Sequence, residues 1–127
     1  MATKSIGKGK KAPRVEHVID ATDRILGRLA TEIAILLQGK DTPDFAANKV
    51  GNNNVIVKNA SKIKVTGKKM TDKIYYHHTG YMGHLREETY KQVIAKDETE
   101  PLRKAVFNML PKNTLRQRRM NRLKIEV

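Results

Sequence analysis

The stretch VEHVIDATDRILGRLATEIAILLQG, Val15–Gly39, constrains the fold more strongly than any other part of the chain. Val15–Ala21 alternates loosely between apolar and polar residues, which predicts a short strand. The next apolar residues recur at helical spacing and form one face, at Leu29, Ile33, Leu36 and Leu37. Thr22 or Asp23 can cap the start of this helix, and Gly39 stands where helices commonly end. The stretch therefore predicts a strand followed by a helix.

The middle of the chain predicts further strands. Residues 40–53 contain Pro, Gly and several Asn or Asp, so they form a long connection. Val55–Val57 is a brief apolar run, typical of a strand buried on both faces. Ile63–Thr66 and Ile74–His78 are two more predicted strands.

The C-terminal third contains the clearest amphipathic helix. Thr89–Gln92 fits a capping box, so one helix begins near Tyr90. Pro101 suits the first turn of a second helix, whose apolar face consists of Leu102, Ala105, Val106, Met109 and Leu110. Residues 113–122 predict a short helix with an outer side that is mostly Arg, and Leu123–Val127 predicts a closing strand.

This order of elements predicts the α/β class, with a mostly parallel central sheet flanked by helices on both faces. The length of 127 residues suits one domain. We expect a basic N-terminal tail over residues 1–14 and a single α/β domain over residues 15–127, which ends in a basic C-terminal segment.

Net charge is the strongest functional signal in the composition. The chain has 26 Lys and Arg against 13 Asp and Glu, a formal net charge of +13. Residues 1–14 and residues 103–124 contain cations and no acid. Positive charge concentrated in two segments of the chain is typical of a surface that binds a polyanion.

Other classes of function receive little support from the composition. The chain has no Cys, which excludes disulfides, zinc ribbons and thiol catalysis. No apolar run approaches the length of a membrane span, and no apolar signal core follows the basic N-terminus. We expect a cytoplasmic protein with no membrane partner.

The stretch KKMTDKIYYHHTGYMGHL, Lys68–Leu85, combines lysines, tyrosines, histidines and glycines with a single acid. Lysines can contact phosphates, and tyrosines offer flat faces to bases or riboses. Glycines allow a close approach of the backbone or a positive φ. A strand end followed by a polar loop would have the same composition, so this stretch alone supports both interpretations.

Arg24 and Arg28 lie near the start of the first predicted helix, where cations oppose the helix dipole. A phosphate bound at the free N–H groups of the helix would explain them. Pairing with Asp20, Asp23 or Glu32 would explain them equally well.

Metal binding and catalysis have weak signals. His77 and His78 are adjacent on a predicted strand, so they point to opposite faces, and His84 completes no ligand pattern. No dinucleotide fingerprint, phosphate-binding P-loop or nucleophile elbow occurs. A His with Asp20, Asp23 or Asp72 could form an acid–base pair, which leaves a small RNA-processing enzyme as an alternative.

Three motifs together resemble the large-subunit ribosomal protein thirteen family in its bacterial form. They are LGRLA at Leu26–Ala30, TDKIYYHHTGY at Thr71–Tyr81, and MLPKN with its basic continuation at Met109–Arg122. The resemblance covers about residues 15–125. It implies a structural ribosomal protein without catalytic duty, which has a parallel sheet flanked by helices and binds large-subunit ribosomal RNA during assembly. Family members often have Arg at the position of His77, so a fixed charge is missing there.

The resemblance and the charge together predict an RNA-binding surface. Its residues are Lys8, Lys10, Lys11, Arg14, Arg24, Arg28, Lys68, Lys69, Lys73, Tyr75, Tyr76, His77, His78, Gly80, Tyr81, His84, Lys112, Arg116, Arg118, Arg119 and Arg122. The expected partners are large-subunit ribosomal RNA and neighbouring large-subunit ribosomal proteins. No cofactor, metal or small-molecule substrate is expected. A regulator that binds DNA or RNA outside the ribosome is the other alternative.

Overall fold

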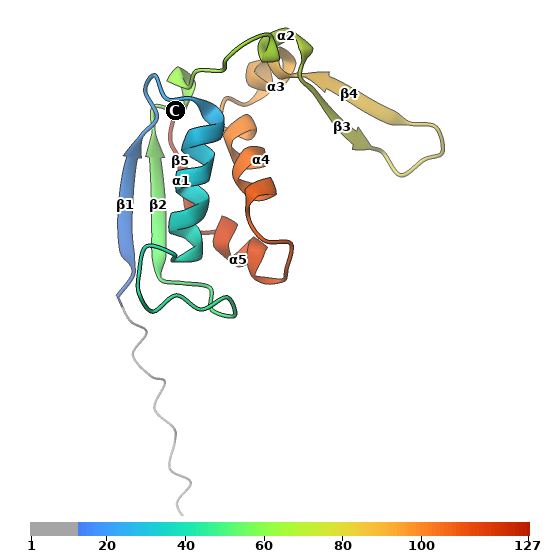
Figure 1. The fold of residues 1–127 in the computed structure, drawn as a ribbon. Coiled ribbons are helices and arrows are strands. Elements are labelled where there is room, and N and C mark those ends of the chain that lie inside the picture. The colour runs from blue at the N-terminus through green and yellow to red at the C-terminus, as the bar shows by residue number, and fades with distance from the viewer. Residues whose placement is uncertain (1–12) are drawn as a thin grey trace, which may run out of the picture.

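The computed structural model describes residues 13–127, so the predictions for Lys8, Lys10 and Lys11 lie outside the described residues. The elements follow in the order β1 (Val15–Asp20), α1 (Leu26–Gln38), β2 (Asn53–Lys58), η1 (Ala60–Lys62), α2 (Lys69–Asp72), β3 (Ile74–His78), β4 (Leu85–Thr89), α3 (Tyr90–Lys96), α4 (Glu100–Met109), α5 (Leu115–Met120) and β5 (Leu123–Ile125). The fold is mixed α/β (Figure 1).

A parallel sheet with the order β1-β2-β5 forms one layer of the molecule. Its register pairs His17 with Val55 and Val55 with Leu123, so these residues share one face. Figure 1 shows α1 and α4 beside that face. The core lies between the two layers, where Val55, Leu29 and their neighbours are inaccessible to solvent.

The opposite face of the sheet is open in the described part of the chain. Val18 is 60% exposed, and its register partner Ile56 is half-exposed. Helices on both faces are therefore not confirmed for residues 13–127. Val55 and Val57 are buried as predicted, whereas Ile56 on the other face is only partly buried, because an apolar run alone does not reveal whether a second layer covers it.

Helix α1 ends as predicted and begins differently. Gly39 adopts φ +78°, and its N–H donates to the last turn of the helix. The N-cap is Ile25, which provides no side-chain hydrogen bond, so the capping role predicted for Thr22 or Asp23 is wrong. The N–H of Leu26 instead donates to the carbonyl of Lys64 at 3.0 Å.

Other predicted elements fall close to their expected positions. The capping box is present, because Thr89 Oγ1 accepts from the Gln92 N–H and Gln92 Oε1 accepts from the Thr89 N–H. Pro101 occupies the first turn of α4. The predicted strand Ile63–Thr66 is wrong, because the segment makes a single bridge, from Lys64 to Ile25.

Asp20 ties the end of β1 to the segment that follows β2. Its Oδ1 accepts from Asn59 Nδ2 at 3.0 Å, from the Thr22 N–H at 3.0 Å and from Thr22 Oγ1 at 2.7 Å. These hydrogen bonds, that from Asn59 first, lower the pKa of Asp20 from 3.8 to about 2.

The ionised form of Asp20 should therefore stabilise the fold. The folded pKa lies below the unfolded one, so this contribution is complete above the unfolded value and is lost as the pH falls through about 2. In urea unfolding from about pH 5 to about pH 2, we expect Asp20→Asn to lose less stability than the wild type. Parallel stability curves for the two proteins would contradict this expectation.

Candidate nucleic-acid interface

Strands β3 and β4 form an antiparallel hairpin that projects from the body of the protein (Figure 1). The register pairs Ile74 with Thr89 at the base and His78 with Leu85 near the tip. Residues 79–84 make the turn, with Gly80 at φ +89° and Gly83 at φ +74°. These angles favour glycine strongly, so the turn requires both residues. The predicted strand Ile74–His78 is confirmed, but it belongs to this hairpin and not to the central sheet.

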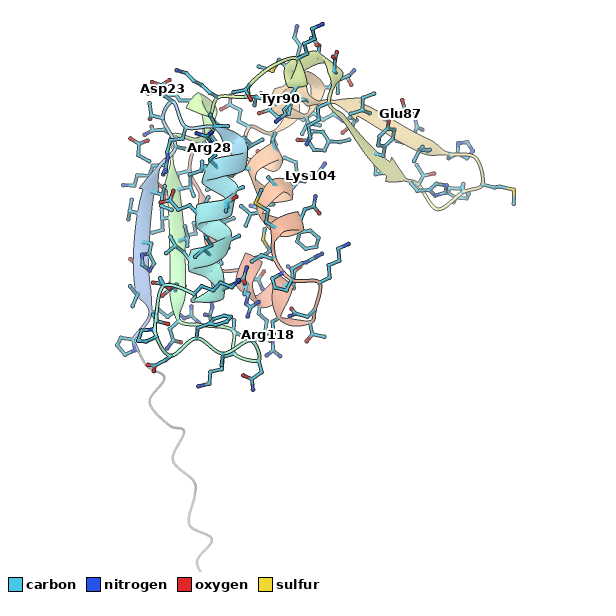
Figure 2. All side chains as sticks on the ribbon, viewed as in Figure 1. Asp23, Arg28, Glu87, Tyr90, Lys104 and Arg118 are labelled. Carbon is cyan, nitrogen blue, oxygen red and sulfur yellow. The ribbon has the colours of Figure 1, made fainter. Side chains whose placement is uncertain are left out.

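Tyr75 anchors the hairpin to the body. Its ring stacks near that of Tyr90, with centroids 6.4 Å apart and an interplanar angle of 28°. The Nζ atoms of Lys73 and Lys104 lie 5.4 and 4.8 Å from the centroid of the Tyr75 ring. Burial, and secondarily the charge of Glu100, raise the pKa of the Tyr75 hydroxyl. The ring is thus engaged within the protein, and Tyr90 and Lys104 are seen at this junction in Figure 2.

The remaining large side chains of the hairpin are exposed. Tyr76 is 60% exposed, Tyr81 is 75% exposed and Met82 is 98% exposed. At the tip, Tyr81 meets His84 edge to face, and His78 Nδ1 accepts from the Gly80 N–H at 2.9 Å. An exposed group of this size marks an interaction site in many soluble proteins, and aromatic rings can stack on unpaired bases.

Exposed lysines surround the base of the hairpin. Lys69 lies in α2, and Lys68 and Lys73 flank that short helix. Both arginines near the start of α1 are exposed; Arg24 pairs with Glu32 at 2.6 Å, and Arg28 is labelled in Figure 2. The pairing with Glu32 is one of the two explanations that the sequence left open for Arg24.

The basic C-terminal segment divides into structural and exposed residues. Arg119 is 1% exposed, and its Nη2 donates to the carbonyl of Lys49 at 2.9 Å. Burial lowers the pKa of the Arg119 guanidinium. Arg122 is half-buried and donates to the carbonyl of Gly51. Both guanidinium groups therefore hold the loop between α1 and β2.

The other cations of this segment lie nearer the surface. Arg116 lies over the ring of Phe107, with 4.1 Å between Cζ and the ring centroid. Lys112 and Arg118 are exposed, and Figure 2 shows Arg118 near the lower end of the helices, at α5. Arg14 is exposed just before β1. Burial, and secondarily the charge of Arg14, lower the pKa of the Arg122 guanidinium. The sequence predicts a helix over residues 113–122 with an outer side that is mostly Arg, and Arg119 departs from this prediction because its side chain is buried.

Sequence reasoning missed β4 and the cation that it carries. Arg86 pairs with His77 in the register of the hairpin, so a fixed positive charge lies beside the histidine. Two glycines between a predicted strand and the stretch LREET were an available signal for a hairpin. Arg103 and Lys104 were also missed, because on a helical wheel they are simply the polar side of α4.

Two further observations concern other kinds of site. In residues 13–127, no three His, Asp or Glu side chains gather as they would around a metal ion. No helix among the same residues has the length and apolar character needed to cross a bilayer.

Comparisons with known proteins identify the family. The model of the ribosomal protein L13 family matches residues 14–125. The chain is 47% identical over 115 residues to large ribosomal subunit protein uL13 of Lactobacillus delbrueckii subsp. bulgaricus, covering 91% of this chain and 78% of that protein. It is 48% identical over 118 residues to uL13 of Chloroflexus aggregans, covering 93% and 82%. It is 45% identical over 120 residues to uL13 of Clostridioides difficile, covering 94% and 84%. This chain therefore belongs to the ribosomal protein L13 family.

Proposed function

We propose that this protein is a structural, non-enzymatic constituent of the large ribosomal subunit, where it binds large-subunit ribosomal RNA and supports assembly. Membership of the ribosomal protein L13 family carries the proposal. The net charge of +13 supports it, because a polyanion would offset the self-repulsion of such a chain. Neighbouring large-subunit proteins are the other proposed partners.

The proposed RNA-binding surface begins at the hairpin. Its tip and exposed face would contact unpaired bases through Tyr76, Tyr81, His77, His78 and His84, with Gly80 allowing close approach. Cations would contact phosphates around it and at the two ends of the chain, namely Lys8, Lys10, Lys11, Arg14, Arg28, Lys68, Lys69, Lys73, Lys112 and Arg118. Five further residues already have partners within the protein, so we assign them supporting roles; they are Arg24, Tyr75, Arg116, Arg119 and Arg122.

Selective binding tests the proposal. Labelled large-subunit ribosomal RNA is titrated with the purified full chain at moderate ionic strength, in the presence of excess small-subunit ribosomal RNA. We expect saturable binding that survives this competitor, and intact RNA after prolonged incubation. Equal affinity for both RNAs, or RNA cleavage that disappears on substitution of one histidine, would overturn the proposal.

The lysines at the base of the hairpin give a quantitative prediction. Changing Lys68, Lys69 and Lys73 to Gln should reduce the slope of log affinity against log salt by about two units, because each phosphate contact contributes about 0.7–0.9. The measurement is RNA affinity over a series of salt concentrations.

A matched variant separates local contacts from net charge. Changing Lys40, Lys49 and Lys58 to Gln removes the same charge from three exposed positions outside the hairpin and its base. We expect a smaller change in the slope for this variant. An equal change would show that the hairpin lysines act only through the total charge of the protein.

A further inference from the structure

A groove of about 470 Å³ separates the hairpin from helices α4 and α5. Its lining comes from all three elements and includes Tyr76, Glu100, Arg103, Phe107, Asn108 and Gln117. The volume lies in the range of about 300–1,000 Å³ that is usual for small-molecule sites. The groove is thus large enough for one nucleotide.

The walls combine an aromatic ring with positive charge. Phe107 is 36% exposed, and the guanidinium of Arg116 lies over its ring. Tyr76 contributes a second ring from the hairpin, and Arg103 is an exposed cation on α4. Proteins that bind single-stranded nucleic acid use this combination, because rings stack on bases while cations attract phosphates.

The polar groups of the groove suit the edge of a base. Gln117 Nε2 donates to Asn121 Oδ1 at 3.2 Å, which leaves Gln117 Oε1 as an acceptor. Asn108 adds a second amide from α4. Glu100 is the one acid in the lining, and Lys104 Nζ lies 3.6 Å from its Oε1, which partly offsets its charge.

We propose that this groove binds a single unstacked nucleotide of the RNA partner, with the base against Phe107 and the phosphate toward Arg103. The inference rests on the proposed function and adds a specific contact to it. The groove would select a looped-out nucleotide in folded RNA. The exposed lysines, in contrast, would contact the phosphates of the RNA whatever its base sequence.

A matched pair of phenylalanine substitutions tests this inference. The chain has two Phe residues, and Phe45 lies outside the groove. Phe45 resembles Phe107 in its surroundings, because it is 41% exposed and Lys40 Nζ lies 5.8 Å from its ring centroid. We expect Phe107→Leu to weaken binding to large-subunit ribosomal RNA roughly tenfold with an unchanged salt slope. Phe45→Leu should leave both quantities unchanged.

Two further variants test the groove independently of Phe107. Asn108→Glu places a carboxylate at an exposed position of α4, where glutamate is a good helix former, and it should weaken binding by a similar factor. Arg103→Gln should lower the salt slope by about one unit. Chemical probing of the complex should also show one base that the wild type protects and that Phe107→Leu leaves reactive.

The outcomes separate this inference from the proposed function. If Phe107→Leu and Asn108→Glu both bind large-subunit ribosomal RNA as tightly as the wild type, the nucleotide site is overturned and the proposed function still stands. Failure of the wild type to prefer large-subunit RNA would overturn both.

Discussion

Arg119→Ala is expected to lower the free energy of unfolding by about 3 kcal/mol, the largest effect on stability that we foresee for a cation of this protein. The side chain is 1% exposed, so its removal opens a cavity. It also leaves the Lys49 carbonyl without the donor that it has at 2.9 Å. Urea unfolding monitored by circular dichroism measures the change.

The adjacent residue provides the control. Arg118 is exposed, so Arg118→Ala should change the free energy of unfolding by less than about 0.5 kcal/mol. Arg118→Ala should instead lower the salt slope of RNA binding by about one unit, which Arg119→Ala should not. Arg119→Met should be milder than Arg119→Ala, because methionine fills the space of the stem without burying a charge. Equal stabilities for the two alanine variants would refute a structural role for Arg119.

Replacement of Tyr76 and Tyr81 together by Ser is expected to weaken RNA binding roughly a hundredfold, because each lost base–aromatic stack is worth about 1–3 kcal/mol. Both rings are mostly exposed, so the midpoint of thermal unfolding should change little. Filter binding or fluorescence anisotropy on the same RNA measures the loss.

Tyr75 gives the opposite pattern and serves as the comparison. Tyr75 immediately precedes Tyr76 in β3, so the two side chains point to opposite faces of the strand, and the ring of Tyr75 packs against that of Tyr90. Tyr75→Ser should loosen the hairpin, which amide hydrogen exchange along β3 and β4 would detect as faster exchange. Full RNA affinity in the Tyr76 and Tyr81 variant would remove these two rings from the proposed surface.

Elements governed by local patterns could be predicted from the sequence. Gly39, the capping box at Thr89 and the apolar face of α4 depend on residues within a few positions of one another. Strand β4 could not be recognised in this way, because LREET lacks an apolar face and is stabilised by pairing with β3. The available sign of this strand was the pair of glycines between the predicted strand Ile74–His78 and LREET.

In the candidate site too, features set by neighbouring residues could be predicted from the sequence, and features set by residues distant in the chain could not. The composition of Lys68–Leu85 marked this stretch as a candidate binding surface, but it fitted a strand end followed by a polar loop equally well. The burial of Arg119 could not be predicted, since its acceptor lies 70 positions away in the chain. Arg103 and Phe107 were missed because the groove exists only where the hairpin and α4 come together.

The order β1-β2-β5 has a consequence for biosynthesis. The last strand pairs with β2, and Arg119 and Arg122 reach back to carbonyls at Lys49 and Gly51. A nascent chain that ends before Leu115 lacks all of these contacts, so its central sheet has only the pairing of β1 with β2. Closure of the domain must then wait for the end of translation, and the incomplete chain exposes an edge of β2 that a companion RNA or chaperone could shield.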